Sequence, residues 1–156
     1  MLHIDIPGYK KIKAEHLVLD YNGTLAIDGI LIEGVKPLLE KIGSQLIIHI
    51  LTADTFGTSQ KEMAGTKCKL VILEPGSQDV QKEQYVLNLG KDRVIAVGNG
   101  QNDALMLREA SLGILVIQRE GAFLKLAGDC EIVCPAITDA LNLLLNPLRI
   151  VATLRK

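Results

Sequence analysis

The chain lacks several features that would assign a protein to a class directly. Tryptophan is absent and aromatic residues make up only 3% of the 156 residues, so the core must be built mainly from aliphatic side chains. No apolar run reaches the roughly 18 residues that a membrane helix needs. The formal net charge of −1 offers no excess of either sign for nucleic acid or an anionic membrane. We therefore expect an aliphatic globular protein with no nucleic-acid or membrane partner.

Cysteine is also scarce and odd in number, with Cys68, Cys130 and Cys134 as the three positions. The N-terminal residues show no charged region followed by an apolar core, so no signal peptide is expected. Both observations favour reduced thiols and a cytoplasmic protein. Cys130 and Cys134 flank a short apolar stretch and have no further metal ligands nearby. This pattern favours core cysteines, with a redox or metal pair as the alternative.

Apolar runs alternate along the chain with longer segments of helical periodicity. Such alternation predicts βαβ units and a parallel sheet, and strands that are apolar on both faces predict helices on both sides of it. We expect strands at 15–20, 46–52, 69–73, 93–97, 112–117 and 131–133. We expect helices at 34–43, 56–64, 78–89, 101–110 and 136–145. The fold class is therefore α/β with a Rossmann-like sheet, and the length favours one domain over residues 1–156.

Three segments fall outside this alternation. Residues 1–14 predict an N-terminal hairpin extension that turns at a Pro-Gly pair. An Asp-Gly pair between apolar residues predicts a second hairpin over residues 24–33. The apolar tail over residues 141–151 contains Pro147, which interrupts a helix. We expect a helix packed on the sheet followed by an extended end, with a homo-oligomer or partner surface as the alternative.

Two apolar runs stop abruptly at a polar turn. The first ends at Asp20 and continues as Tyr-Asn-Gly-Thr-Leu, and the second ends at Gly98 and continues as Asn-Gly-Gln-Asn-Asp. Open α/β sheets bind ligands outside the carboxyl ends of their strands, so the two turns predict a shared site for a metal ion and a phosphate. A dinucleotide-binding fingerprint is excluded, because it needs a third glycine where the chain has Asp103.

The same two segments carry a resemblance to a known family. Residues 20–25 resemble the first motif of the haloacid dehalogenase (HAD) superfamily, and residues 98–103 resemble its fourth, acidic metal-binding motif. The longer stretch 97–105 is most similar to the phosphorylation domain of P-type ATPases. The chain looks like a soluble, capless relative of that domain, and the match covers roughly residues 15–135. The resemblance implies a three-layer α/β/α fold with a β-hairpin flap over residues 24–33.

The resemblance also implies roles for individual residues. Asp20 would be the nucleophile that accepts a phosphoryl group as an aspartyl-phosphate. The turn at Gly23 and Thr24 would present backbone N–H groups to the phosphate. Thr52 matches the second motif, a hydroxyl that bonds a phosphate oxygen, and Ala53 replaces the glycine that follows it in P-type ATPases.

The third motif of the family is a lysine, for which Lys82 is the candidate. It would neutralise both the nucleophile and the transferring phosphate, and Lys61 and Lys91 are the competing positions. The cofactor implied is Mg²⁺, which takes oxygen ligands and often keeps several waters. The predicted metal ligands are Asp20, the backbone carbonyl of Asn22, Asn99 and Asp103.

Two positions carry an amide where the family carries an acid. Asn22 stands where phosphatases of the superfamily have an aspartate that protonates the leaving group and later activates water. An amide cannot transfer a proton in this way, although P-type ATPases have a threonine there. Asn99 stands where both groups have an aspartate, and its oxygen can still bind a cation but brings no charge. Weakened activity is therefore expected.

The predicted function is that of a magnesium-dependent phosphohydrolase or phosphoryl transferase that works through Asp20. The absence of a cap-sized insertion leaves the site open, so the phosphorylated substrate can be small or macromolecular. One alternative is a regulator with a long-lived aspartyl-phosphate. The other is a degenerate module that catalyses nothing and binds a partner through its flap or apolar tail.

Overall fold

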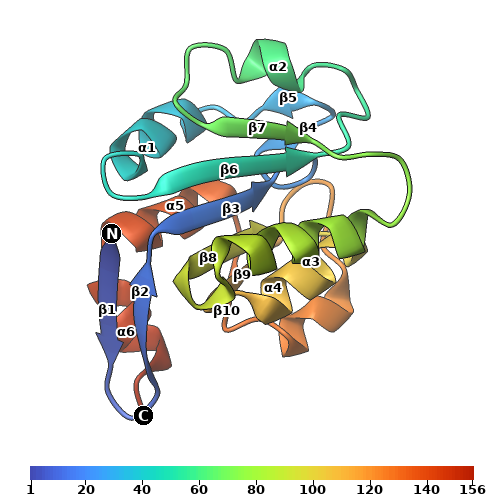
Figure 1. Ribbon diagram of the computed structural model, residues 1–156. Helices are drawn as coiled ribbons and strands as arrows, with labels where there is room; N and C mark the ends of the chain where they lie inside the picture. Colours follow the sequence, from blue (N-terminus) through green and yellow to red (C-terminus); the bar gives the residue numbers. More distant parts are fainter.

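The computed structural model describes residues 1–156, and its centre is a six-stranded parallel sheet (Figure 1). In spatial order the strands are β10 (Ile132–Cys134), β9 (Leu112–Val116), β8 (Val94–Gly98), β3 (His16–Asp20), β6 (Ile47–Thr52) and β7 (Lys69–Ile72). All five neighbouring pairs are parallel, which confirms the predicted α/β class.

Helices cover both faces of this sheet and complete three layers (Figure 1). On one face α3 (Gln78–Leu89) packs against α4 (Ala104–Glu109), and on the other α1 (Val35–Ile42) packs against α5 (Ile137–Leu145). The short α2 (Ser59–Glu62) follows β6, and α6 (Leu148–Leu154) ends the chain. The 3₁₀ turns are η1 (Lys91–Arg93), η2 (Gln101–Asp103) and η3 (Leu124–Gly128).

The position of β3 inside the sheet, between two helical layers, explains why its sequence is apolar without alternation. Leu17 and Leu19 belong to the larger core cluster, which includes the inner faces of α1 and α5. Val18 points to the opposite side and belongs to the smaller cluster with residues of α3 and α4. All three side chains are fully buried, because a strand between two helical layers has no solvent face.

Two antiparallel hairpins are attached to this sheet. β1 (Leu2–Ile6) pairs with β2 (Lys10–Ala14), and its alternating buried residues face α6. β4 (Ala26–Ile27) pairs with β5 (Ile30–Leu31) directly after the turn that follows β3. The second hairpin, hereafter the flap, therefore stands over the carboxyl edge of the sheet.

The C-terminal tail differs from the expected extended end. α6 begins directly after Pro147, so the proline starts a second helix instead of leading into extended chain. A proline is tolerated at this position because the N–H groups of the first helical turn have no partner within the helix. No single helix is long and apolar enough to cross a membrane; α5 and α6 reach that length and composition only as a pair bent by 105°.

Candidate functional site

The strand register places the predicted site residues at one edge of the sheet. Asp20 ends β3 beside Leu51 of β6, so Thr52 lies one residue further along the same edge. β8 pairs with the other side of β3 and ends at Gly98. Three strand ends therefore converge where ligands bind in open α/β sheets.

A buried lysine joins the two acids of this edge. Lys82 Nζ lies 2.6 Å from Asp20 Oδ1 and 2.7 Å from Asp103 Oδ1. Its side chain is only 1% exposed, although it extends from the second turn of α3. Of the competing lysines, Lys91 pairs with Glu109 at the surface and Lys61 is exposed. The structure thus brings Lys82 alone of the three candidates into contact with Asp20.

This cluster has two carboxylates for one ammonium group. Burial, together with the carboxylate of Asp103, raises the pKa of Asp20 from 3.8 to about 7, even though Lys82 opposes the shift. Burial alone would lower the pKa of Lys82, but the carboxylates of Asp103 and Asp20 outweigh it and raise that pKa above its usual value. The lysine therefore stays charged, and the cluster is short of one positive charge.

Thr24 and Gly23 connect Asp20 to the loop after β8. Thr24 Oγ1 lies 3.0 Å from Asp20 Oδ2 and 3.2 Å from Asn99 Oδ1, so its single hydrogen serves one acceptor at a time. Gly23 has φ +79°, and a Cβ there would lie 2.4 Å from Asn99 Nδ2. Only glycine satisfies both the backbone conformation and this close approach.

The backbone donors of this turn differ from the prediction. The N–H of Gly23 donates to the carbonyl of Ala26 at 2.8 Å, and the N–H of Thr24 donates to the carbonyl of Tyr21 at 3.2 Å. Both groups therefore close the turn on itself and do not face a ligand. The N–H groups of Tyr21 and Asn22, which directly follow the nucleophile candidate, have no protein acceptor.

The end of β6 supplies a further pair of donors. Thr52 Oγ1 accepts the N–H of Asp54 at 2.9 Å, which leaves its own hydrogen free to donate. Asp54 is held in the left-handed region at φ 52° and accepts the N–H of Ser59, the first residue of α2, at 3.0 Å. The N–H of Ala53 has no protein acceptor. The Thr52 hydroxyl and the Ala53 N–H can therefore both bind an anion at this strand end.

Asp103 anchors the loop that follows β8. Its Oδ2 accepts the N–H groups of Asn99 and Gly100, each at 2.9 Å, while Oδ1 accepts from Lys82. A Cβ at Gly98 would lie 2.5 Å from Asp103 Cγ, so this glycine makes room for the carboxylate. Both oxygens of Asp103 are thus engaged, which suits an anchoring role better than a direct bond to a metal.

The oxygen ligands at this edge suit a hard cation but carry little negative charge. No group of three or more His, Cys, Asp or Glu side chains lies together in a way that could hold a metal. The available oxygens come from Asp20, Asn22 and Asn99, and the Oδ1 atom of Asn22 is buried without any hydrogen-bond partner. Mg²⁺ binds such oxygens and keeps several waters, so the residues present suit it with few charged ligands.

The cysteines form no site in this structure. All three are free thiols. Burial, with smaller contributions from nearby acids, raises the pKa of Cys130 to about 12 and that of Cys134 to about 11. Because the thiolate is the reactive and metal-binding form, these thiols are poor ligands and poor nucleophiles.

A loop without any recognisable motif also contacts the site. Residues 117–123 connect β9 to η3, and the side chain of Gln118 donates to the carbonyls of Gly23 and Thr24. Asn99 Nδ2 donates to the carbonyl of Gly121 at 3.0 Å. The loop carries no motif, so only its position in the fold indicates a role.

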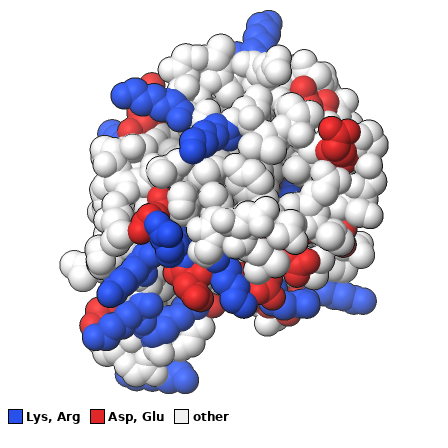
Figure 2. Space-filling model, in the orientation of Figure 1, with Lys and Arg blue, Asp and Glu red and all other residues white.

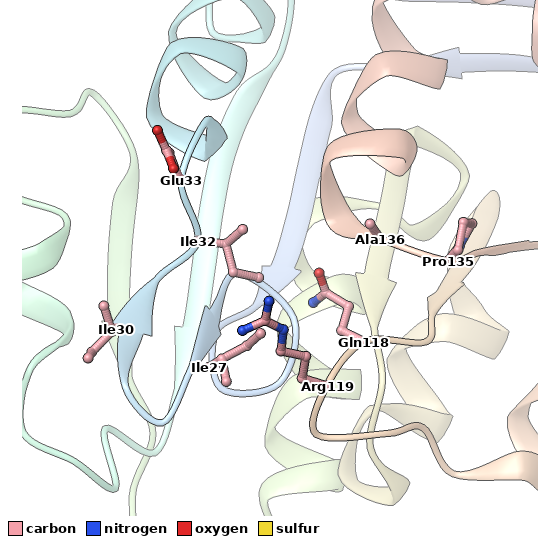
Figure 3. A pocket seen from close by; sticks show the side chains of 8 residues that line it. All are labelled: Ile27, Ile30, Ile32, Glu33, Gln118, Arg119, Pro135 and Ala136. Carbon is pink, nitrogen blue, oxygen red and sulfur yellow. The ribbon is translucent and has the colours of Figure 1, made fainter.

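A pocket of about 550 Å³ lies between the flap and this loop (Figure 3). Ile27, Ile30 and Ile32 of the flap region form one part of its lining, and Gln118 and Arg119 form another. The remaining lining residues lie beside the N-terminal ends of α1 and α5, whereas Lys82 reaches Asp20 from α3 on the opposite face. Neither Asp20 nor Lys82 lines the pocket, but Gln118 belongs to its lining and also bonds the turn that follows Asp20.

Comparisons with known proteins place this geometry in context. No family model matches the chain. Over 84 residues the chain is 45% identical to uncharacterized protein MJ0073 of Methanocaldococcus jannaschii, an alignment that covers 51% of this chain and 90% of that protein.

Several solved structures share the fold at low identity. The cobalt-bound deoxy-D-mannose-octulosonate 8-phosphate phosphatase of Haemophilus influenzae has a TM-score of 0.71 and 11% identity, with 86% of this chain and 88% of that chain covered. The related phosphatase of Moraxella catarrhalis, solved with magnesium, phosphate and KDO, has a TM-score of 0.65 and 16% identity, with 90% and 92% covered. A Streptomyces avermitilis protein described as a HAD family hydrolase has a TM-score of 0.64 and 19% identity, with 92% and 85% covered. The chain thus has the fold of the haloacid dehalogenase superfamily and belongs to the same family as the M. jannaschii protein.

Proposed function

We propose that the protein is a magnesium-dependent phosphohydrolase or phosphoryl transferase that carries the phosphoryl group on Asp20. The observation that carries this proposal is the buried contact of Lys82 with Asp20 and Asp103. The backbone N–H groups of Tyr21, Asn22 and Ala53 add unpaired donors at the same edge. Preorganised donors of this kind stabilise the charge of a transferring phosphoryl group.

The reaction would proceed in two displacements at phosphorus. An oxygen of Asp20 attacks the phosphoryl group, the bond from phosphorus to the leaving oxygen breaks, and the leaving oxygen keeps the electron pair. Water then attacks the aspartyl-phosphate, which releases phosphate and returns Asp20 as a carboxylate. Lys82 stays protonated throughout and offsets the charge of the phosphoryl oxygens, while Thr24 orients the carboxylate through Oδ2.

A cation would bind the side-chain oxygens of Asp20 and Asn99 and the backbone carbonyl of Asn22, and when bound it would add the positive charge that the cluster lacks. The magnesium and phosphate in the Moraxella catarrhalis structure support both ligands for a site on this fold. Asp103 would keep the loop that carries Asn99 in place through its two N–H contacts. Removal of the cation should therefore weaken phosphoryl binding.

Asn22 restricts the substrates that such a site can use. Its amide cannot protonate a leaving alkoxide, so good leaving groups are favoured, as in acyl phosphates and phosphoanhydrides. The same residue favours a second candidate function, a regulator whose aspartyl-phosphate persists because water is not activated. The two functions differ in the rate of phosphate release from Asp20 and share the first displacement.

The test of the proposal is the binding of beryllium trifluoride, which mimics an aspartyl-phosphate and needs no knowledge of the substrate. We expect calorimetry to show binding that requires both Mg²⁺ and Asp20, with none in the Asp20→Asn variant. Asp139→Asn, on α5, serves as the control for an acid-to-amide change away from the site. Absence of binding by folded wild-type protein would overturn the proposal and favour a degenerate module.

Substitution of Asn99 by aspartate should strengthen cation binding. A carboxylate adds a charged ligand, and ligand charge is a main determinant of cation affinity, so we expect Mg²⁺ to bind on the order of tenfold more tightly. The carboxylate would also face the carbonyl of Gly121, to which the amide now donates. The metal-free variant should therefore be less stable by about 1–3 kcal/mol. Calorimetry showing equal or weaker Mg²⁺ affinity would contradict this expectation.

A further inference from the structure

The loop between β9 and η3 contacts three separate parts of the site. Gln118 Nε2 donates to the carbonyl of Gly23 at 3.0 Å and to that of Thr24. The carbonyl of Gly121 accepts from Asn99 Nδ2 at 3.0 Å. Glu120 accepts the N–H of Asp28, at the tip of the flap, at 2.8 Å. A short loop thus joins the turn after the nucleophile, the loop after β8 and the flap.

Gln118 uses its whole carboxamide in these contacts. While Nε2 donates to the two carbonyls, Oε1 accepts the N–H of Ile137, the first residue of α5, at 3.0 Å. Figure 3 shows the side chain between the turn region beside Ile27 and the start of α5 at Ala136. The carboxamide of Gln118 therefore links the first residue of α5 to the turn. These contacts fix the peptide groups whose carbonyls belong to Gly23 and Thr24.

Fixing this peptide fixes the reacting carboxylate. Thr24 is the residue whose hydroxyl contacts both Asp20 and Asn99, so a shift of its backbone would move that hydroxyl. The Cα of Gly23 packs so closely against Asn99 that no side chain fits between them. Asn99 in turn is held from its other side by Gly121. A shift of the turn would therefore also displace the side-chain amide of Asn99.

We propose that Gln118 is a positioning residue of the phosphoryl site, acting through Gly23 and Thr24 on Asp20 and Asn99. This inference rests on the proposed function for its effect on phosphoryl binding. Residues that orient the ligands of a metal or phosphate site, without touching the ligand, typically change affinity or activity by about 10–100-fold when replaced. The same range is expected here.

The Gln118→Glu variant separates positioning from helix capping. Glutamate keeps the length of the side chain and an oxygen acceptor for the N–H of Ile137, but it loses both donors to the turn. We expect its affinity for beryllium trifluoride with Mg²⁺ to fall by about 10–100-fold. The urea-unfolding midpoint should also fall, because the new carboxylate faces the carbonyls of Gly23 and Thr24, while the contact with α5 is kept. The Gln118→Leu variant, which also loses the helix contact, should lose the same affinity and be less stable.

The matched control is Asn142→Asp, which removes the donation of an amide to the carbonyl of Thr138 within α5. It should bind beryllium trifluoride as wild type does. Unchanged affinity in folded Gln118→Glu would overturn the proposal. Failure of wild type itself to bind would overturn the proposed function instead, and a second measurement then decides the inference.

That second measurement is nuclear magnetic resonance of the unliganded protein. Gln118→Glu should shift the side-chain amide signals of Asn99 and accelerate hydrogen exchange of the Gly23 and Thr24 N–H groups, because the turn loses its anchor. Asn142→Asp should leave these signals unchanged. Asn99 signals and exchange rates like those of wild type in Gln118→Glu would overturn the positioning role, whatever the protein binds.

Discussion

Replacement of Asp20 by asparagine should abolish phosphoryl transfer and at the same time make the metal-free protein more stable. The nucleophile is lost, since an amide does not form an acyl phosphate by this route. The stability gain follows from the pKa of Asp20, which burial beside Asp103 raises from 3.8 to about 7. At pH 8 the folded protein must keep this buried carboxylate ionised, which costs about 4 kcal/mol relative to the unfolded chain. Asparagine removes that cost.

The sign of the pH dependence provides the check. A carboxyl whose pKa is higher in the folded state destabilises the protein progressively as pH rises from 3.8 towards about 7. The advantage of Asp20→Asn in urea unfolding should therefore be largest at pH 8 and shrink towards pH 4. Mg²⁺ should stabilise the wild type and not the variant, because only the wild type keeps the charged ligand.

Asp103→Asn is the matched control for this experiment. Asp103 is fully buried, and its Oδ2 accepts two backbone N–H groups. The NH2 group of an asparagine at this position would therefore point at a hydrogen-bond donor instead of an acceptor. The same chemical change should therefore stabilise the protein at position 20 and destabilise it at position 103. A lower unfolding midpoint for Asp20→Asn than for wild type at pH 8 would contradict the conclusion that ionised Asp20 destabilises the folded protein.

The sequence was most informative where one local pattern determines one structural feature. The apolar runs that end at Asp20 and Gly98 predicted two buried strands of a parallel sheet, because strands buried on both faces have no polar alternation. The structure places these two strands side by side. The resemblance implied Lys82 as the lysine of the third motif, and the structure brings Lys82 to Asp20. Such features depend on strand direction and helix period, both of which are local.

The remaining features depend on contacts between distant residues. Gln118 reaches the turn at Gly23 across 95 positions of chain, and nothing in its neighbours distinguishes it from a surface glutamine. His49, which interrupts an apolar strand, lies between His16 Nδ1 at 3.1 Å and the Tyr85 hydroxyl at 2.9 Å. Periodicity shows that such side chains are buried, but their partners follow only from the packing of several elements.

The turn after β3 illustrates a smaller error of the same kind. A glycine turn next to an acid indicated an anion-binding loop, and unpaired N–H groups do lie there. They belong to Tyr21 and Asn22, because the turn uses the N–H groups of Gly23 and Thr24 to close on itself. The residue types predict a turn at this position. Which N–H groups close the turn depends on the backbone conformation, which the residue types do not determine.

Substitution of Asn22 by aspartate should accelerate the release of phosphate from Asp20. Loss of general acid–base help typically costs a rate factor of about 10²–10⁴, so restoring an ionisable group at this position should recover a large part of it. The site is suited to a protonated acid, since Asn22 Oδ1 is buried and has no partner, and burial beside other carboxylates raises a carboxyl pKa. The measurement is single-turnover release of labelled phosphate after phosphorylation by acetyl phosphate.

Asn22→Leu gives the matched comparison, because it removes the amide and supplies no proton. If acid–base chemistry limits release, Asn22→Leu should release phosphate as slowly as wild type while Asn22→Asp releases it faster. A release rate in Asn22→Asp equal to that of wild type, with Asp20 still required, would show that another group already supplies the proton. A faster rate would instead identify Asn22 as the reason that a phosphoryl group persists on Asp20, and so favour a slow, switch-like cycle over rapid turnover in the native chain.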